Sequence, residues 1–336
     1  MRQSDNKSLF SFWVSQFLTE EIITNRRMSV NTQKSYRDTF LLFIKFLEKY
    51  GFTNILRFHI QQITPDLIIA FLQFLENERN ASAATCNQRL ATIKSFVSYV
   101  SRQAPEFLNA SSAIINIPKK KAMQKIIDYL SRDEMNFLLE LPDKNSYLGY
   151  RNFTLLLFMY NTGARASEVA QVKLSDLQLD GSPYVRLMGK GNKHRVCPLW
   201  KKTMTAVQNL TEMNAAEHSS HVFYGIRNNP ISRHGIYEII QSVSKSAKLQ
   251  YPSIRDKNIT PHSIRHTTAV HLLMAGVDIN SIRAWLGHVS IETTNVYATI
   301  SLEMKAKAIE KCAITTTEST PLWENNENLI NYLKSI

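Results

Sequence analysis

The feature that most constrains the fold is a break in the helical pattern of the chain, NIPKKKAMQK at residues 116–125. It combines a proline and a run of lysines with few apolar residues, a composition typical of an extended linker. A chain of 336 residues is also long enough for two domains with separate cores. We therefore expect a first domain at residues 1–115, a basic interdomain linker at 116–126 and a second domain at 127–313.

The first domain is predicted to be helical throughout. Apolar residues recur at helical spacing in four stretches, and Thr64 with Pro65 supplies the start signal for the third. Four amphipathic helices with short connections indicate a compact bundle. Basic residues on its polar faces and in the linker suit contacts with DNA phosphates, although a solvated helix face explains any one of them equally well. These candidates are Lys34, Arg37, Arg89, Lys94, Lys119, Lys120 and Lys121.

The second domain has a mixed pattern. Ser131 and Glu134 form an S-x-x-E capping box that begins a helix, and the apolar stretch YRNFTLLLFMYNTG predicts a buried helix that ends at Gly163. In contrast, YVRLMGKGNKHRVCPLW predicts two strands joined by a basic turn, a β-hairpin. Helices follow up to residue 312. The expected fold class is therefore mainly α with a small β-sheet or hairpin.

Charge and composition favour one kind of partner and exclude several kinds of site. Forty Lys and Arg against 28 Asp and Glu give a net charge of +12, which favours a polyanion, nucleic acid first. Three distant cysteines without a C-x-x-C pair predict no disulfide or zinc framework, and so a reducing cytoplasm. The sequence contains no long apolar run, P-loop, dinucleotide fingerprint, HExxH motif or spaced acidic triad. We expect no membrane partner, no metal and no other cofactor.

Three segments carry basic residues that suit phosphoryl chemistry without a metal, which needs arginines on the phosphate oxygens and a proton donor. Arg165 in NTGARASEV follows a glycine cap, which would hold its guanidinium rigidly; the alternative is that it caps the carbonyls of its own helix. His262 and Arg265 share one face at the start of a helix, where the dipole favours an anion. Lys190 and Lys193 lie in the hairpin loop, as a general acid and a DNA contact or simply as a solvated turn.

The stretch WLGHVSIETTNVYATI places a histidine and a tyrosine nine residues apart. On one unbroken helix His288 and Tyr297 would lie on opposite sides. Gly287 is expected to end one helix and Ser290 to begin the next, so the chain turns between the two residues. That turn can bring both side chains toward one pocket.

Taken in order, TGARASE, GKGNKHRVCPL, HSIRH and LGHVSIETTNVY resemble the motifs of the tyrosine recombinase family, which includes phage integrases, Xer recombinases and transposon-encoded relatives. The resemblance is close over about residues 130–312. It implies a helical, SAM-like core-binding domain and an α/β catalytic domain that form a C-shaped clamp on double-stranded DNA.

The resemblance also implies a role for each matching residue. Tyr297 would attack a DNA phosphate and form a 3′-phosphotyrosyl link, while Arg165 and Arg265 hold the non-bridging oxygens. Lys190 would protonate the leaving 5′-oxygen.

Three further residues complete the implied site. His262 would be the acid/base partner of the tyrosine, His288 would hydrogen-bond the scissile phosphate, and Glu168 would orient its neighbours without doing chemistry. The phosphotyrosine link stores the bond energy, so the reaction would need neither ATP nor metal.

The same resemblance implies a tetramer on a core site with inverted repeats, in a cytoplasmic, nucleoid-associated protein. The tail at 314–336 would be a helix donated to a neighbouring protomer. Two alternatives share much of this pattern: a type IB topoisomerase with the same chemistry, and a DNA-binding accessory protein without catalysis. Among recombinases, the roles of phage integrase, chromosome-dimer resolvase, integron integrase and transposon recombinase stay open, and the ending ATISLEMKAKAIEKC favours a mobile element.

Overall fold

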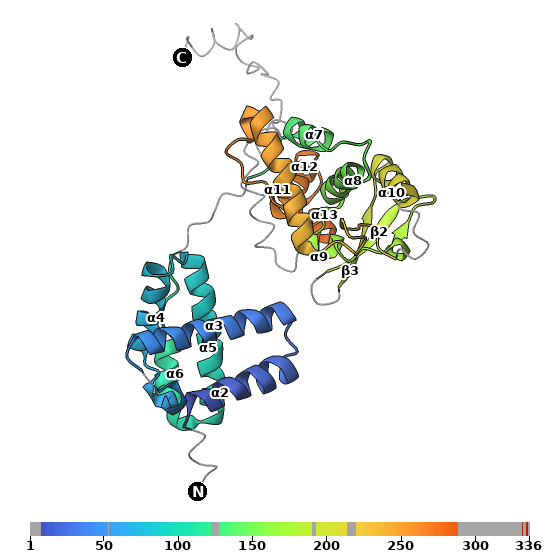
Figure 1. Ribbon diagram of the computed structural model, residues 1–336. Coiled ribbons are helices and arrows are strands. Elements are labelled where there is room, and N and C mark those ends of the chain that lie inside the picture. The colour runs from blue at the N-terminus through green and yellow to red at the C-terminus, as the bar shows by residue number, and fades with distance from the viewer. Residues whose placement is uncertain are drawn as a thin grey trace. The chain divides into compact units, whose positions relative to one another are not determined.

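The computed structural model describes residues 8–52, 54–121, 128–189, 193–213 and 220–287, with residues 331 and 334. The chain divides into two compact units, Met1–Lys125 and Ile126–Ile336 (Figure 1). Helices dominate both units in the described ranges, and a small sheet lies in the second, which confirms the predicted fold class. None of the described helices is long and apolar enough to cross a membrane.

The helices of the first unit begin where short polar side chains cap them. Ser29, Thr64 and Ser82 each accept a hydrogen bond from the backbone amide three residues later, which satisfies a donor that the first turn leaves free. The four expected helices are present, and the first of them continues as a π-helix; the structure adds a short helix after the fourth that the sequence did not predict. These elements are α2 (Phe10–Gln16), the π-helix η1 (Phe17–Asn25), α3 (Val30–Lys49), α4 (Pro65–Asn77), α5 (Ala83–Gln103) and α6 (Leu108–Ile115).

Aromatic rings fill the core of the first unit. Phe96 of α5 is fully buried and meets Phe40, Phe17 and Phe10 edge-on, with ring centroids 5.1, 5.5 and 5.8 Å away. Edge-on contacts of this kind stabilise a core beyond the apolar area that they bury. The packing therefore joins α2, η1, α3 and α5 around one centre.

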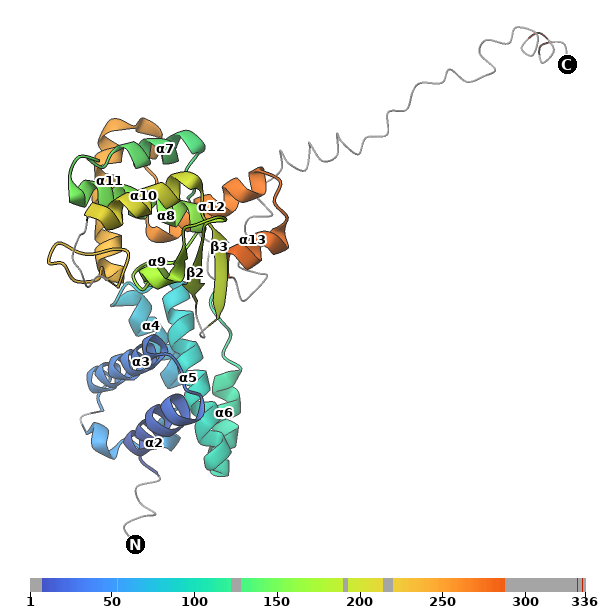
Figure 2. The same cartoon turned by 90° about the vertical axis from the view of Figure 1, so that its right-hand side faces the viewer.

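The second unit is built around one buried helix, α8. Leu155, Leu156 and Phe158 of this helix are fully buried, and α8 packs between α10 and α12 (Figure 2). The predicted capping box of Ser131 and Glu134 is present at the start of the preceding helix. The helices of this unit are α7 (Arg132–Glu140), α8 (Tyr147–Thr162), α9 (Ala166–Val169), α10 (Lys201–Met213), α11 (Arg233–Gln250), α12 (Pro261–Met274) and α13 (Ile279–Leu286).

The sheet of the second unit contains the predicted hairpin and one added strand. Strands β1 (Leu177–Gln178), β2 (Tyr184–Met188) and β3 (His194–Pro198) are antiparallel and lie in that order. Met188 and His194 form the last pair between β2 and β3, and the loop that joins the two strands begins directly after Met188.

Two left-handed glycines bring the ends of α8 and α13 together. Gly163 ends α8 with a φ of +60°, and Gly287 ends α13 with a φ of +65°. A Cβ on Gly163 would lie 2.4 Å from Cδ2 of Leu286, so the two helix ends leave no room for a methyl group.

We predict that Gly163→Ala destabilises the second unit far more than Gly181→Ala, its matched control. Both glycines have a positive φ, but nothing lies within 4 Å of a Cβ built on Gly181. The control should therefore lose only the roughly 1–2 kcal/mol of a left-handed alanine. Gly163→Ala should lose about 1–3 kcal/mol more, because Leu286 must move. Hydrogen exchange of the α8 amides at increasing urea concentrations measures the free energy of unfolding of each variant. Equal losses in the two variants would contradict the close packing of Gly163 against Leu286.

Candidate active site

Glu168 organises the start of α9. One oxygen of its carboxylate, Oε2, accepts a hydrogen bond from the backbone amide of Arg165 at 2.8 Å, and Oε1 accepts one from Nη1 of the same arginine at 2.8 Å. Arg165 is thus the N-cap residue of α9, and its guanidinium pairs with Glu168 and does not cap the carbonyls of α8. The Arg165 side chain is 36% exposed and the Glu168 side chain 3%. The arginine therefore has one fixed edge and one edge open to a ligand.

A second arginine, which the sequence motifs did not predict as a site residue, binds the same carboxylate. Arg195 of β3 donates from Nη1 to Oε1 of Glu168 at 3.0 Å and from Nη2 to Oε2 at 2.7 Å. Its Nε donates to the carbonyl of Trp285 at 2.9 Å. The signal in the sequence was strand alternation: Arg195 shares a face with the buried Cys197, so it is a charged residue at an inward position.

The charges in this cluster stabilise one another. Burial alone would raise the pKa of the Glu168 carboxyl, but the hydrogen bonds and charge of Arg195, with those of Arg165, outweigh it and lower that pKa. Burial would likewise lower the pKa of Arg195, and Glu168 outweighs it and raises that pKa. Glu168 and Arg195 are therefore both ionised at neutral pH.

Arg265 lies deeper than the sequence predicts. It is 2% exposed, and its Nη1 and Nη2 donate to the carbonyls of Gly163 and Leu286, each at 2.6 Å. We expected an amphipathic helix with His262 and Arg265 on an outer face, but Ser263–His271 is buried on all sides. Hydroxyl side chains make this burial possible, because they donate hydrogen bonds to backbone carbonyls within the unit. A sequence pattern that counts them as polar therefore underestimates how much of the helix is buried.

His262 stands at the rim of this cluster. His262 is an exposed residue, and its imidazole ring contacts the ring of His266 edge-on, with the two ring centroids 4.5 Å apart. The protein packed around the ring, and then the positive charges of Arg265 and Arg165, lower the pKa of His262. The three side chains are therefore close enough to interact, and the imidazole is neutral at pH 7. Of the other predicted catalytic residues, Lys190, His288 and Tyr297 lie outside the described residues.

The predicted DNA contacts divide into two groups. Two basic residues of α5 make contacts within the first unit: Arg89 donates to the carbonyl of Ser35 at 2.9 Å, and Nζ of Lys94 donates to the carbonyl of Ile117 at 2.6 Å. Lys120 pairs with Glu76. The remaining candidates are exposed: Lys34, Arg37, Lys119, Lys121 and Lys193.

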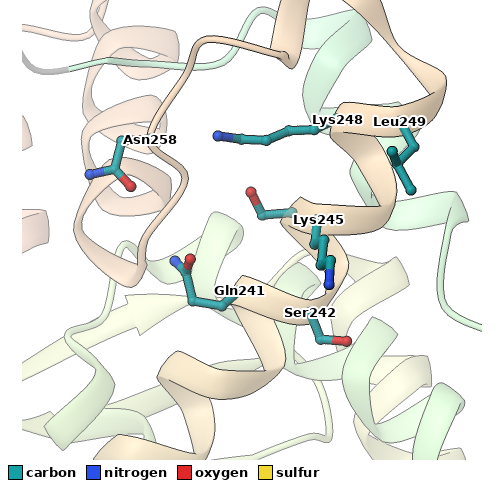
Figure 3. A pocket seen from close by; sticks show the side chains of 7 residues that line it. Gln241, Ser242, Lys245, Lys248, Leu249 and Asn258 are labelled. Atoms are coloured by element: carbon teal, nitrogen blue, oxygen red, sulfur yellow. The ribbon is translucent and has the colours of Figure 1, made fainter.

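A cavity of about 580 Å³ opens elsewhere in the second unit, along the C-terminal half of α11. Figure 3 shows Lys245 and Lys248 on one wall and Asn258 on the other. None of the described catalytic candidates lines this cavity. It is therefore distinct from the Glu168 cluster. In the part of the chain that the structure describes, no group of three His, Cys, Asp or Glu is placed to hold a metal ion.

Two family models match this chain. The model described as the phage integrase family matches residues 128–303, and the one described as the phage integrase N-terminal SAM-like domain matches residues 11–105. The chain belongs to the phage integrase family. It is thus a tyrosine recombinase, an enzyme that breaks and rejoins DNA strands at specific sites, as its motifs predicted.

Similar proteins span nearly the whole recombinase. The y4rC protein of Sinorhizobium fredii, an integrase/recombinase by name, is 33% identical over 96% of this chain and 97% of its own length. The tyrosine recombinase XerD of Halalkalibacterium halodurans is 29% identical over 86% and 93%. In fold, the chain resembles the Tn1549 transposon integrase, with a TM-score of 0.69 at 16% identity over 90% of this chain and 99% of that one. It also resembles the XerH recombinase, with a TM-score of 0.66 at 22% identity over 88% and 84%.

We predict that His262 titrates below the ordinary histidine value of about 6.5 in the DNA-free chain. Because the unfolded chain binds this proton more readily than the folded chain, the folded state loses stability through this group as pH falls below that value. Arg165→Met should raise the pKa of His262, since it removes one of the positive charges. NMR titration of the ring protons measures the change. Arg233→Met, an exposed arginine of α11, is the control, and equal shifts in the two variants would refute the interaction.

Proposed function

We propose that this recombinase cleaves DNA through Tyr297, with Arg165 and Arg265 neutralising the scissile phosphate. The observation that supports the proposal is the cluster around Glu168, where a half-exposed arginine stands beside a neutral histidine and a buried arginine. Fixed positive charge at a phosphate is the main requirement of phosphoryl transfer, because negative charge builds up on its oxygens.

The proposed reaction proceeds in two transfers. The Tyr297 hydroxyl loses its proton to the neutral imidazole of His262 and attacks phosphorus. The bond from phosphorus to the 5′-oxygen breaks, Lys190 gives that oxygen a proton, and a 3′-phosphotyrosyl link remains. His288 donates a hydrogen bond to the phosphate in this scheme. A 5′-hydroxyl of another strand then attacks the link and releases Tyr297, so no external energy source is needed.

We further propose that the chain acts as a tetramer on a core site with inverted repeats, for a mobile genetic element. A net charge of +12 suits a clamp on duplex DNA through the exposed basic residues of both domains and the linker at 116–126. Two structurally similar proteins support the choice of partner: the Tn1549 integrase is in complex with transposon right end DNA, and XerH is bound to a palindromic difH substrate. The tail at 314–336 is proposed as the helix that docks on a neighbouring protomer. Its apolar pattern consists of Leu322, Trp323, Leu329, Ile330 and Leu333.

We predict that the full chain forms a covalent adduct with a nicked duplex that carries its recognition sequence, recovered from a random library by binding to the chain. The nick lets the short fragment with the freed 5′-hydroxyl diffuse away, so the phosphotyrosyl link cannot be reversed. Denaturing electrophoresis then counts trapped chains. Adduct should form in EDTA, Tyr297→Phe should form none, and Arg165→Ala should react about 100-fold more slowly or worse.

Two outcomes would change the assignment. A wild-type chain that binds the duplex but never forms an adduct would be the DNA-binding accessory protein. A chain that relaxes supercoiled plasmid of unrelated sequence, without exchanging strands between two sites, would be the topoisomerase.

A further inference from the structure

We propose that Arg195 is a positioning residue that keeps the Arg165 guanidinium available for phosphate; this inference rests on the proposed function. Arg195 does not touch the phosphate in this scheme. It acts by occupying the carboxylate that would otherwise capture Arg165.

The first step is the division of Glu168 between two arginines. Arg195 holds both carboxylate oxygens with Nη1 and Nη2, whereas Arg165 contributes Nη1 and its backbone amide. Among the described residues, Glu168 is the acceptor for the Arg165 guanidinium, and Nη1 is the nitrogen that it engages. The other N–H groups of the Arg165 guanidinium can therefore bind a ligand, because a planar guanidinium can donate to two different acceptors along two different edges.

The second step is the charge of the cluster. Two guanidinium groups share one carboxylate, so the cluster carries a net positive charge beside the open edge of Arg165. The Arg195 side chain is 9% exposed and that of Glu168 3%, so water screens their attraction weakly. Without Arg195, Glu168 and Arg165 would form a neutral pair. The buried carboxylate would then draw Arg165 into a two-oxygen fork, away from phosphate.

The third step is the contact of Arg195 with the end of α13. Its Nε donates to the carbonyl of Trp285, and a Cβ on Gly287 would lie 3.2 Å from Cδ and Nη1 of Arg195. The same side chain therefore fixes the backbone immediately before His288. It also belongs to β3, the strand that follows the loop with Lys190. From the strand that follows Lys190, Arg195 therefore contacts both the carboxylate that binds Arg165 and the backbone just before His288.

The test compares Arg195→Met, Glu168→Gln and the double variant in single-turnover cleavage of the nicked duplex. Methionine keeps much of the length of the arginine but not its charge or donors. We expect Arg195→Met to cleave about 100-fold more slowly at saturating DNA, as a misplaced catalytic group does. The double variant should cleave roughly 10-fold faster than Arg195→Met, because a neutral amide binds Arg165 more weakly than a carboxylate. Arg186→Met, at an exposed arginine of β2, is the matched control and should cleave like the wild type.

A residue that only supports the fold gives a different result. In that case the double variant would be no faster than Arg195→Met once each rate is divided by the fraction of folded chain, which urea unfolding measures, because the glutamine then only relieves the cost of an unpaired buried carboxylate. Wild-type cleavage by Arg195→Met would overturn the proposal directly.

A measurement without DNA separates this inference from the proposed function. Phenylglyoxal labels available guanidinium groups, and mass spectrometry reads the label at Arg165. Labelling should be slower in Arg195→Met than in the wild type and should recover in the double variant, because the freed carboxylate holds Arg165. If the wild type forms no covalent adduct, the proposed function fails, while this order of labelling still decides the role of Arg195. Faster labelling in Arg195→Met would overturn it.

Discussion

The buried guanidinium of Arg265 is the contact on which the second unit depends. A charge that is 2% exposed loses its hydration, a penalty of several kcal/mol, and needs strong acceptors in return. Its acceptors are the carbonyls of Gly163 and Leu286, at the ends of α8 and α13. The last carbonyls of a helix have no partner within it and lie at the negative end of its dipole. Arg265 therefore satisfies two helix ends at once, and the left-handed glycines position both of them.

Local signals in the sequence predicted the parts of this arrangement that local chemistry determines. Ser131 and Glu134 form the capping box of α7, and Gly163 and Gly287 end their helices as expected. Each is a short-range preference that needs no knowledge of the rest of the chain. The β2–β3 hairpin follows from strand alternation around a glycine-rich turn in the same way.

The features that the sequence did not predict depend on contacts between distant segments. Arg195 and Glu168 are 27 positions apart, and no periodicity relates a strand residue to the first turn of a helix. The burial of Ser263–His271 in α12 was missed because its hydroxyl residues count as polar, although Thr268 donates a hydrogen bond to the carbonyl of Tyr160. The role of a charged residue is equally hard to predict from local sequence. Arg89 lies on a helix face predicted to be polar, but it donates a hydrogen bond to the carbonyl of Ser35 in α3. The net charge of the chain includes such arginines, although only exposed basic residues can displace counterions from DNA.

The electrostatics of the cluster also bear on the order of events in the proposed reaction. Burial, and then the charges of Arg265 and Arg165, lower the pKa of His262, so the imidazole is neutral before DNA arrives. A bound phosphate would bring negative charge to the same arginines and offset their effect on the histidine. His262 would then become a stronger base only once a phosphate is in place. The charges that are proposed to bind the substrate would thereby restrain proton transfer until the scissile phosphate is bound.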